Sequence, residues 1–227
     1  NGFKRPVLFP KIVFLYDKNL HGDGSSKYPN GDVFNEGIEC SSKTMYPDWL
    51  SLTGEGYVSE MYKKYGRVVS PMGCRAFLSP WYEKGGMHPS DENDKPIFEG
   101  RFNLGVVSLN LPMILAKSRK ESKDFYEVLD YYLELIRNHH KRTYDYIGEL
   151  RASVNPVAFC QGGLYGGNLK PEEKIKSILP PMTMSYGITA LNELQRLYNG
   201  KSIREDGEFA LEVMKYINDY TNKIKEE

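Results

Sequence analysis

The stretch Ser-Pro-Met-Gly-Cys-Arg-Ala-Phe-Leu-Ser-Pro-Trp (residues 70–81) decides how this chain is interpreted, because neither a core strand nor an amphipathic helix is typically built this way. Pro71 and Gly73 favour backbone turns just before Cys74, and Arg75 follows the cysteine directly. We therefore predict that Cys74 lies on a tight loop and not inside a helix. Taken by itself, a free cysteine is more often a small buried hydrophobic residue.

A second informative run follows, Gly-Arg-Phe-Asn-Leu-Gly-Val-Val-Ser-Leu-Asn-Leu-Pro (residues 100–112). Its aliphatic residues predict a buried strand over residues 104–111, closed by Pro112. Asn103 precedes this strand and Asn110 stands near its end. An amide offers a donor and an acceptor without adding charge, so either side chain could hold sugar hydroxyls. The position of Asn110 before Leu-Pro favours a role in ending the secondary structure.

Together, the Met-Gly-Cys-Arg loop and the Gly-Arg-Phe-Asn-Leu-Gly run resemble the central part of the anaerobic, class III ribonucleoside-triphosphate reductases, which are glycyl radical enzymes. The resemblance implies that Cys74 forms the thiyl radical that attacks the ribonucleotide and that Asn103 is the active-site asparagine. It also implies an α/β fold, in which this chain is part of a ten-stranded α/β barrel with the cysteine finger loop inserted through its centre.

Three further residues are candidates for substrate binding. Arg101 could reach a phosphate, although a structural ion pair is an equal alternative. Cys160, in Asn-Pro-Val-Ala-Phe-Cys-Gln-Gly-Gly (residues 155–163), could lie near the substrate, but the resemblance places the second active-site cysteine of the family before the start of this sequence. Ser185 is expected at a helix start, where free N–H groups could bind an anion; an ordinary N-cap is the alternative.

The resemblance also implies cofactors and partners. The parent enzyme would act on ribonucleoside triphosphates, carry a glycyl radical installed by an iron–sulfur and S-adenosylmethionine activase, bind a structural zinc near its C-terminus, use formate or a thiol as reductant, and form a homodimer. The glycyl radical motif, the paired Cys-x-x-Cys zinc motifs and the allosteric segments of the family are not found among these 227 residues. We therefore expect a single partial catalytic-barrel domain over residues 1–227, inactive by itself.

Two alternatives remain open at this point. The chain could belong to another glycyl radical enzyme, such as a formate acetyltransferase, although Gly-Arg-Phe-Asn-Leu-Gly favours the reductase. It could also be a non-catalytic nucleotide-binding or assembly module, in which the Gly-Cys loop is a packing feature.

The composition excludes several classes of protein. Thirty basic and thirty acidic side chains cancel, so no bulk field favours nucleic acid or an anionic membrane. No apolar run is long enough to span a bilayer. The three cysteines, Cys40, Cys74 and Cys160, are too few and too scattered for a disulfide framework, which favours a cytoplasmic setting. The four histidines lack the spacing of a metal site, and His21 and His88 are expected in exposed loops.

Hydrophobic periodicity and turn residues predict the remaining elements of an α/β arrangement. Strands are expected over residues 7–17, 68–69 and 153–159. A surface loop is expected around residues 22–31. Helices are expected in short pieces over residues 45–65, then over residues 121–151, from about 184 to 198 with a C-cap at Asn199-Gly200, and over residues 208–224.

Overall fold

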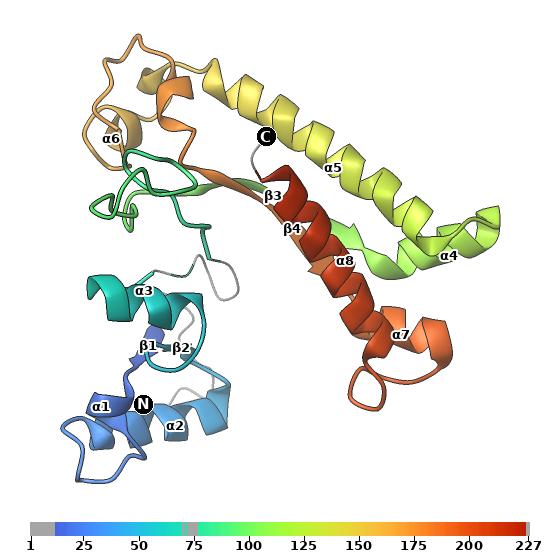
Figure 1. The fold of residues 1–227 in the computed structure, drawn as a ribbon, viewed down its shortest axis with the longest axis horizontal. Helices are drawn as coiled ribbons and strands as arrows, with labels where there is room; N and C mark the ends of the chain where they lie inside the picture. Colours follow the sequence, from blue (N-terminus) through green and yellow to red (C-terminus); the bar gives the residue numbers. More distant parts are fainter. Residues whose placement is uncertain (1–11, 70, 72–76, 226–227) are drawn as a thin grey trace. The chain divides into compact units, whose positions relative to one another are not determined.

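The computed structural model describes residues 12–69, 71 and 77–225, which fall into two compact units (Figure 1). The first unit ends at Leu78, and the second is Ser79–Glu227. Cys74 lies outside the described residues, so its placement on a loop stays a prediction.

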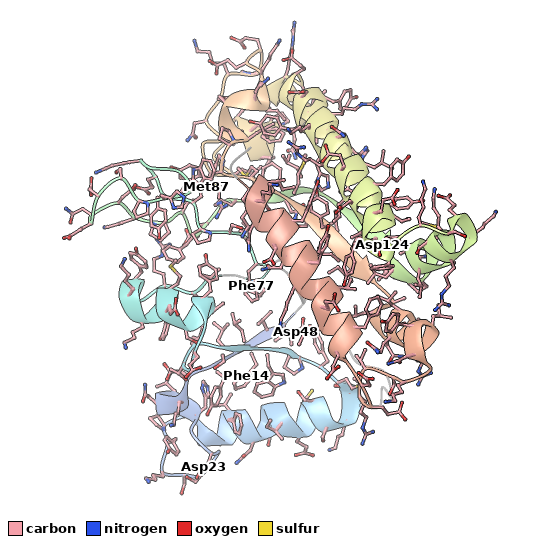
Figure 2. All side chains as sticks on the ribbon, turned by 45° about the vertical axis from the view of Figure 1, so that its right-hand side comes forward. Phe14, Asp23, Asp48, Phe77, Met87 and Asp124 are labelled. Carbon is pink, nitrogen blue, oxygen red and sulfur yellow. The ribbon has the colours of Figure 1, made fainter. Side chains whose placement is uncertain are left out.

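The first unit is built on a parallel pair of short strands, β1 (Val13–Tyr16) and β2 (Asp48–Ser51). Parallel strands need a crossover connection, which α1 (Lys18–His21) and α2 (Gly31–Thr44) supply; α3 (Tyr57–Tyr65) follows β2. Phe14 pairs in register with Trp49, and their ring centroids lie 4.4 Å apart. Figure 2 labels Phe14 and Asp48, one on each strand. This aromatic packing joins the two strands to α2, since Phe34 contacts both rings.

Two predictions for the first unit are confirmed in part, and two are wrong. The expected loop is present over residues 22–30, before α2 begins at Gly31, and within the range 45–65 expected to form short helical pieces only α3 is helical, since β2 precedes it. Val68 and Val69 form no strand. His21 is only 7% exposed, because its ring packs beside Phe14 and its Nδ1 accepts a hydrogen bond of 3.0 Å from the Asp17 backbone N–H.

The second unit contains another parallel pair, β3 (Asn103–Asn110) and β4 (Thr183–Thr189). The crossover between them is long. It consists of α4 (Leu111–Glu121), α5 (Phe125–Gly148), the 3-10 turn η1 (Ala152–Val154), α6 (Pro156–Phe159) and the 3-10 turn η2 (Ile175–Ile178). After β4 the chain forms α7 (Leu191–Asn199) and α8 (Glu208–Ile224).

The main core of the second unit lies between the helices and one face of the β3–β4 pair. The side chains of Leu109, Leu129, Leu133, Leu194 and Val213 are almost completely buried there. The Tyr186 ring of β4 contacts His140 of α5 and Tyr220 of α8, so both helices lie on the same face of the strands. Figure 1 shows these two long helices, α5 in yellow-green and α8 in red, beside the strands.

Several predictions for the second unit are confirmed. The strand over residues 104–111 corresponds to β3, the final helix to α8, and Gly200 ends α7 in the left-handed conformation with φ +82°. The long helix is also present, but it begins at Phe125. Asp124, labelled in Figure 2, is its N-cap, and its carboxylate accepts hydrogen bonds from the N–H groups of Tyr126 and Glu127.

Three other elements differ from the sequence predictions. The expected strand over residues 153–159 is instead η1 and α6, because the Asn155 side chain caps α6 and Pro156 occupies its first turn. The helix expected from residue 184 is strand β4 up to Thr189, and only α7 is helical. Pro112 does not simply close β3, since it lies in the first turn of the unpredicted helix α4.

Among the described residues, no helix has both the length and the apolar character needed to cross a membrane.

Candidate functional site

Asn103 lies at an irregularity in β3. It pairs in register with Thr183, whereas Val106 pairs with Ser185, so three residues along β3 match two along β4. Such a bulge takes a backbone group out of the regular ladder. The Asn103 side chain compensates, because its Oδ1 accepts a hydrogen bond of 2.8 Å from the Gly105 backbone N–H. Asn103 is therefore held by the local geometry of its own strand.

The other end of the Asn103 amide contacts Ser185. Asn103 Nδ2 donates a hydrogen bond to Ser185 Oγ, across from β3 to β4. The assignment of the amide is chemically determined, since only Oδ1 can accept from the Gly105 N–H. Two of the predicted site residues, far apart in the sequence, are thus brought together.

Ser185 is not where the sequence suggested. It lies in the middle of β4 and not at a helix start, so the proposed anion site on free N–H groups is wrong. The alternating residues Met184, Tyr186 and Ile188 were the missed signal, because polar and small residues occupy the positions between them. That alternation is typical of a strand with one apolar face.

The two faces of the β3–β4 pair differ in chemistry. Val107 and Leu109 pack with Tyr186 into the helical core, so the intervening residues face the other way. On that second face, Val106 is 61% exposed and Ser108 is also exposed. A Cβ built on Gly187 would lie 2.2 Å from Ser108 Oγ, which shows how closely the two strands' side chains approach there. This face, with Asn103, Ser185, Ser108 and Gly187, is called the polar face below.

Arg101 is held close to the start of the polar face by backbone carbonyls. Its Nε donates to the Pro181 carbonyl and its Nη1 to the Ser79 carbonyl, both at 2.6 Å. The bond to Pro181 ties the chain before β3 to the chain before β4, and the bond to Ser79 ties it to the start of the second unit. They give Arg101 a structural role in this unit, and its approach to a phosphate stays a prediction.

Asn110 and Cys160 have local structural partners. Asn110 is the N-cap of α4, and its Oδ1 accepts from the Met113 N–H at 3.1 Å, which confirms its predicted role in local structure. Cys160 follows α6 and is half-buried against a second apolar cluster that includes Ala152 and Leu179. Its Sγ is a free thiol, and its closeness to a substrate remains a prediction.

A cavity of about 1040 Å³ lies beside β4 in the second unit. It is lined by both Thr183 and Ser185 and by Met184 and Tyr186, so it reaches both faces of the strand. Basic side chains predominate among its charged residues, which are Arg101, Arg137, Lys141, Asp145 and Lys225. Thr183 Oγ1, which borders this cavity, is buried and has no hydrogen-bond partner among the described residues.

His140 lies on the helical side of the same cavity. It is 9% exposed, and its Nε2 has no hydrogen-bond partner within the described part of the chain. Burial, and then the neighbouring His139, lower the pKa of His140 below its ordinary value. On α8, burial and the hydrogen bond to Asp130 raise the pKa of Tyr216 to about 12. These groups are neutral at pH 7 and belong to the packing of the helices.

The residue types of a metal site do not converge in the described ranges, where no group of three or more His, Cys, Asp or Glu side chains could hold a metal ion.

Comparison with known proteins identifies the relatives of the chain. The sequence model of a family described as anaerobic ribonucleoside-triphosphate reductase matches residues 1–227. Proteins named anaerobic ribonucleoside-triphosphate reductase are similar to the chain in Haemophilus influenzae (35% identical, 89% of this chain), Escherichia coli (30%, 89%) and Enterobacteria phage T4 (32%, 84%). The matched region is 26%, 26% and 30% of those proteins, respectively. The chain thus spans little more than a quarter of their length, and the matches favour the reductase over a formate acetyltransferase or a non-catalytic module.

Proposed function

The chain belongs to the anaerobic ribonucleoside-triphosphate reductase family, and on this premise we propose that it supplies the cysteine loop and part of the substrate site of such a reductase. The proposed reaction removes the 2′-hydroxyl of a ribonucleoside triphosphate. One observation carries the proposal beyond family membership: the Asn103 amide is fixed at both ends, by the Gly105 N–H and by Ser185 of the neighbouring strand.

In the proposed reaction, a glycyl radical made by a separate iron–sulfur and S-adenosylmethionine activase supplies the oxidising equivalent. Cys74 becomes a thiyl radical and abstracts the 3′-hydrogen of the ribose, after which the 2′-hydroxyl leaves as water. Formate, or a thiol, supplies the two electrons. The contribution of this chain is to place the sulfur and orient the sugar, and misplacement of reacting groups by about 1 Å can cost on the order of 100-fold in rate.

Asn103 is proposed to orient the sugar. Its Oδ1 has a second lone pair and its Nδ2 a second hydrogen after the bonds to Gly105 and Ser185 are counted. The amide can therefore accept one hydrogen bond and donate another to ribose hydroxyls. Arg101, beside the same strand, is proposed to approach the phosphates, and Cys160 stays a weaker candidate for contact with the substrate.

The ten-stranded barrel with a central cysteine finger belongs to the same proposal. Two parallel strand pairs with helical crossovers are the pattern expected of segments of an α/β barrel. The remaining partners are proposed from the family: the activase, a structural zinc and glycyl radical held outside these residues, a homodimer, and a cytoplasmic location.

The experiment that tests the proposal compares a full-length reductase carrying this chain with the isolated 227-residue chain. With activase, formate and each of the four ribonucleoside triphosphates, the full-length protein should form deoxyribonucleotides. The isolated chain should form none, because it lacks the glycyl radical motif. No product from a full-length protein that contains the glycyl radical, or product from the isolated chain, would contradict the proposal.

A further inference from the structure

We infer that Ser185 is a positioning residue, which sets the orientation of the Asn103 amide for catalysis. The inference rests on the proposed function, because it assigns Ser185 a task in the same substrate site. Ser185 Oγ lies on β4 and receives a hydrogen bond from Asn103 Nδ2 on β3. The two residues are 82 positions apart in the sequence, so only the β3–β4 pairing brings them together.

Two contacts restrain the Asn103 amide, whose plane turns about the Cβ–Cγ bond. The bond from the Gly105 N–H holds one end of this plane, at Oδ1. The bond from Nδ2 to Ser185 fixes the opposite end of the same plane. With both ends held, the second lone pair on Oδ1 and the second hydrogen on Nδ2 point in defined directions. A preorganised amide of this kind does not have to be ordered when the substrate binds.

The surroundings leave Ser185 suited to this task. The residues next to it in sequence, Met184 and Tyr186, face the helical side, and Tyr186 packs against His140 there. Its neighbour in the register is Val106, whose side chain cannot form hydrogen bonds. Asn103 and Ser185 are both uncharged, so hydrogen bonds and not an ion pair orient the amide. The hydroxyl accepts from Asn103 and keeps its own hydrogen.

A double-mutant cycle in a full-length reductase carrying this chain tests the inference. Ser185→Ala should lower kcat by roughly tenfold, the effect of one lost hydrogen bond, with a much smaller change in KM. Asn103→Ala should lower kcat by about 100-fold. Because Ser185 acts through Asn103, the double variant should be no slower than Asn103→Ala. Ser185→Thr, which keeps the hydroxyl and suits a strand, should restore most of the activity.

Ser108→Ala is the matched control, since it removes another serine hydroxyl from the polar face and should leave kcat within about twofold. The inference is overturned if Ser185→Ala keeps wild-type kcat, if the losses in the double variant multiply, or if Ser185→Thr is as slow as Ser185→Ala. The proposed function fails separately: in that case the unmodified protein forms no deoxyribonucleotide, or Asn103→Ala retains full turnover. Thermal unfolding of each variant distinguishes loss of orientation from loss of fold.

Discussion

The two faces of the β3–β4 pair are made by the same two strands, yet their side chains have different roles. One face carries Val107, Leu109 and Tyr186 against α5 and α8. The core side chains of these helices, such as Leu129 and Val213, are almost fully buried. The polar face carries an amide, hydroxyls and a glycine, with Val106 and Ser108 exposed. Burial on one face therefore stabilises the unit, and the polar face carries the side chains to which the proposed chemistry is assigned.

The largest effect expected from this contrast is on stability and comes from the helical face. Leu129 is completely buried in the core, so Leu129→Ala should lower the free energy of unfolding by about 2–5 kcal/mol, measured by urea denaturation. Leu135→Ala, on the same helix but 51% exposed, should cost less than about 1 kcal/mol. Equal losses for the two leucines would show that α5 does not bury the face described here.

The next effect is on catalysis and comes from the polar face. In a full-length reductase carrying this chain, Asn103→Ala should lower turnover by about 100-fold. Since the amide also accepts from the Gly105 N–H, the same change should cost roughly 1 kcal/mol of stability. Asn110→Ala is the internal control: it removes the N-cap of α4, costs roughly 1 kcal/mol, and should leave turnover nearly unchanged. The reverse pattern of turnover would mean that the wrong asparagine was chosen.

A substitution at Gly187 tests how closely β3 and β4 approach each other on the polar face. A Cβ at this position would lie 2.2 Å from Ser108 Oγ and 3.1 Å from Ser108 Cα. Gly187→Ala should therefore cost about 1–3 kcal/mol in thermal or urea unfolding. Adding Ser108→Gly removes the obstructing side chain and should recover part of that loss. No loss in the single variant would indicate a wider spacing at this point.

The smallest effect is on the pH dependence of stability, and it comes from His140 on the helical face. The pKa of His140 is lowered by burial, so the unfolded chain binds a proton more readily than the folded one. Its contribution to stability is complete above the ordinary histidine pKa of about 6.5, and it declines as the pH falls toward the lowered folded value. His140→Phe should reduce the change in melting temperature between pH 7.5 and 5.5.

The adjacent His139 is exposed, which makes His139→Gln a close control for that measurement. It should keep most of the pH dependence of the unmodified chain, because burial is the larger cause of the lowered His140 pKa and His139 the smaller one. A His140→Phe variant with the same slope as the unmodified chain would assign the pH dependence to other groups.

The elements predicted correctly are those whose sequence signal is strong and local. Strand β3, the long helix α5 and the final helix α8 each follow from a regular apolar pattern. The boundary of α5 was missed by a few residues, because the cap at Asp124 lies within a run of charged residues. Helix α2 was missed because its apolar signal is weak and Gly31, a residue typical of loops, begins it.

Strand β4 shows why part of the candidate site could not be predicted. Its polar and small residues alternate with Met184, Tyr186 and Ile188. The helix α7 that follows continues the apolar pattern, so the boundary between β4 and α7 is hard to locate from the sequence. The contact between Asn103 and Ser185 depends on the register and on the bulge in β3. Register is a tertiary property, which no single stretch of sequence specifies.

Cys74 is proposed to carry the radical chemistry that this chain contributes to a reductase. The most direct measurement is deoxyribonucleotide formation by a full-length reductase with Cys74→Ser, with the glycyl radical followed by electron paramagnetic resonance. A hydroxyl cannot readily replace the thiol as a hydrogen-atom carrier, so we expect a normal glycyl radical signal and no deoxyribonucleotide. Turnover comparable to the unmodified enzyme, in a variant with the same radical content, would contradict it.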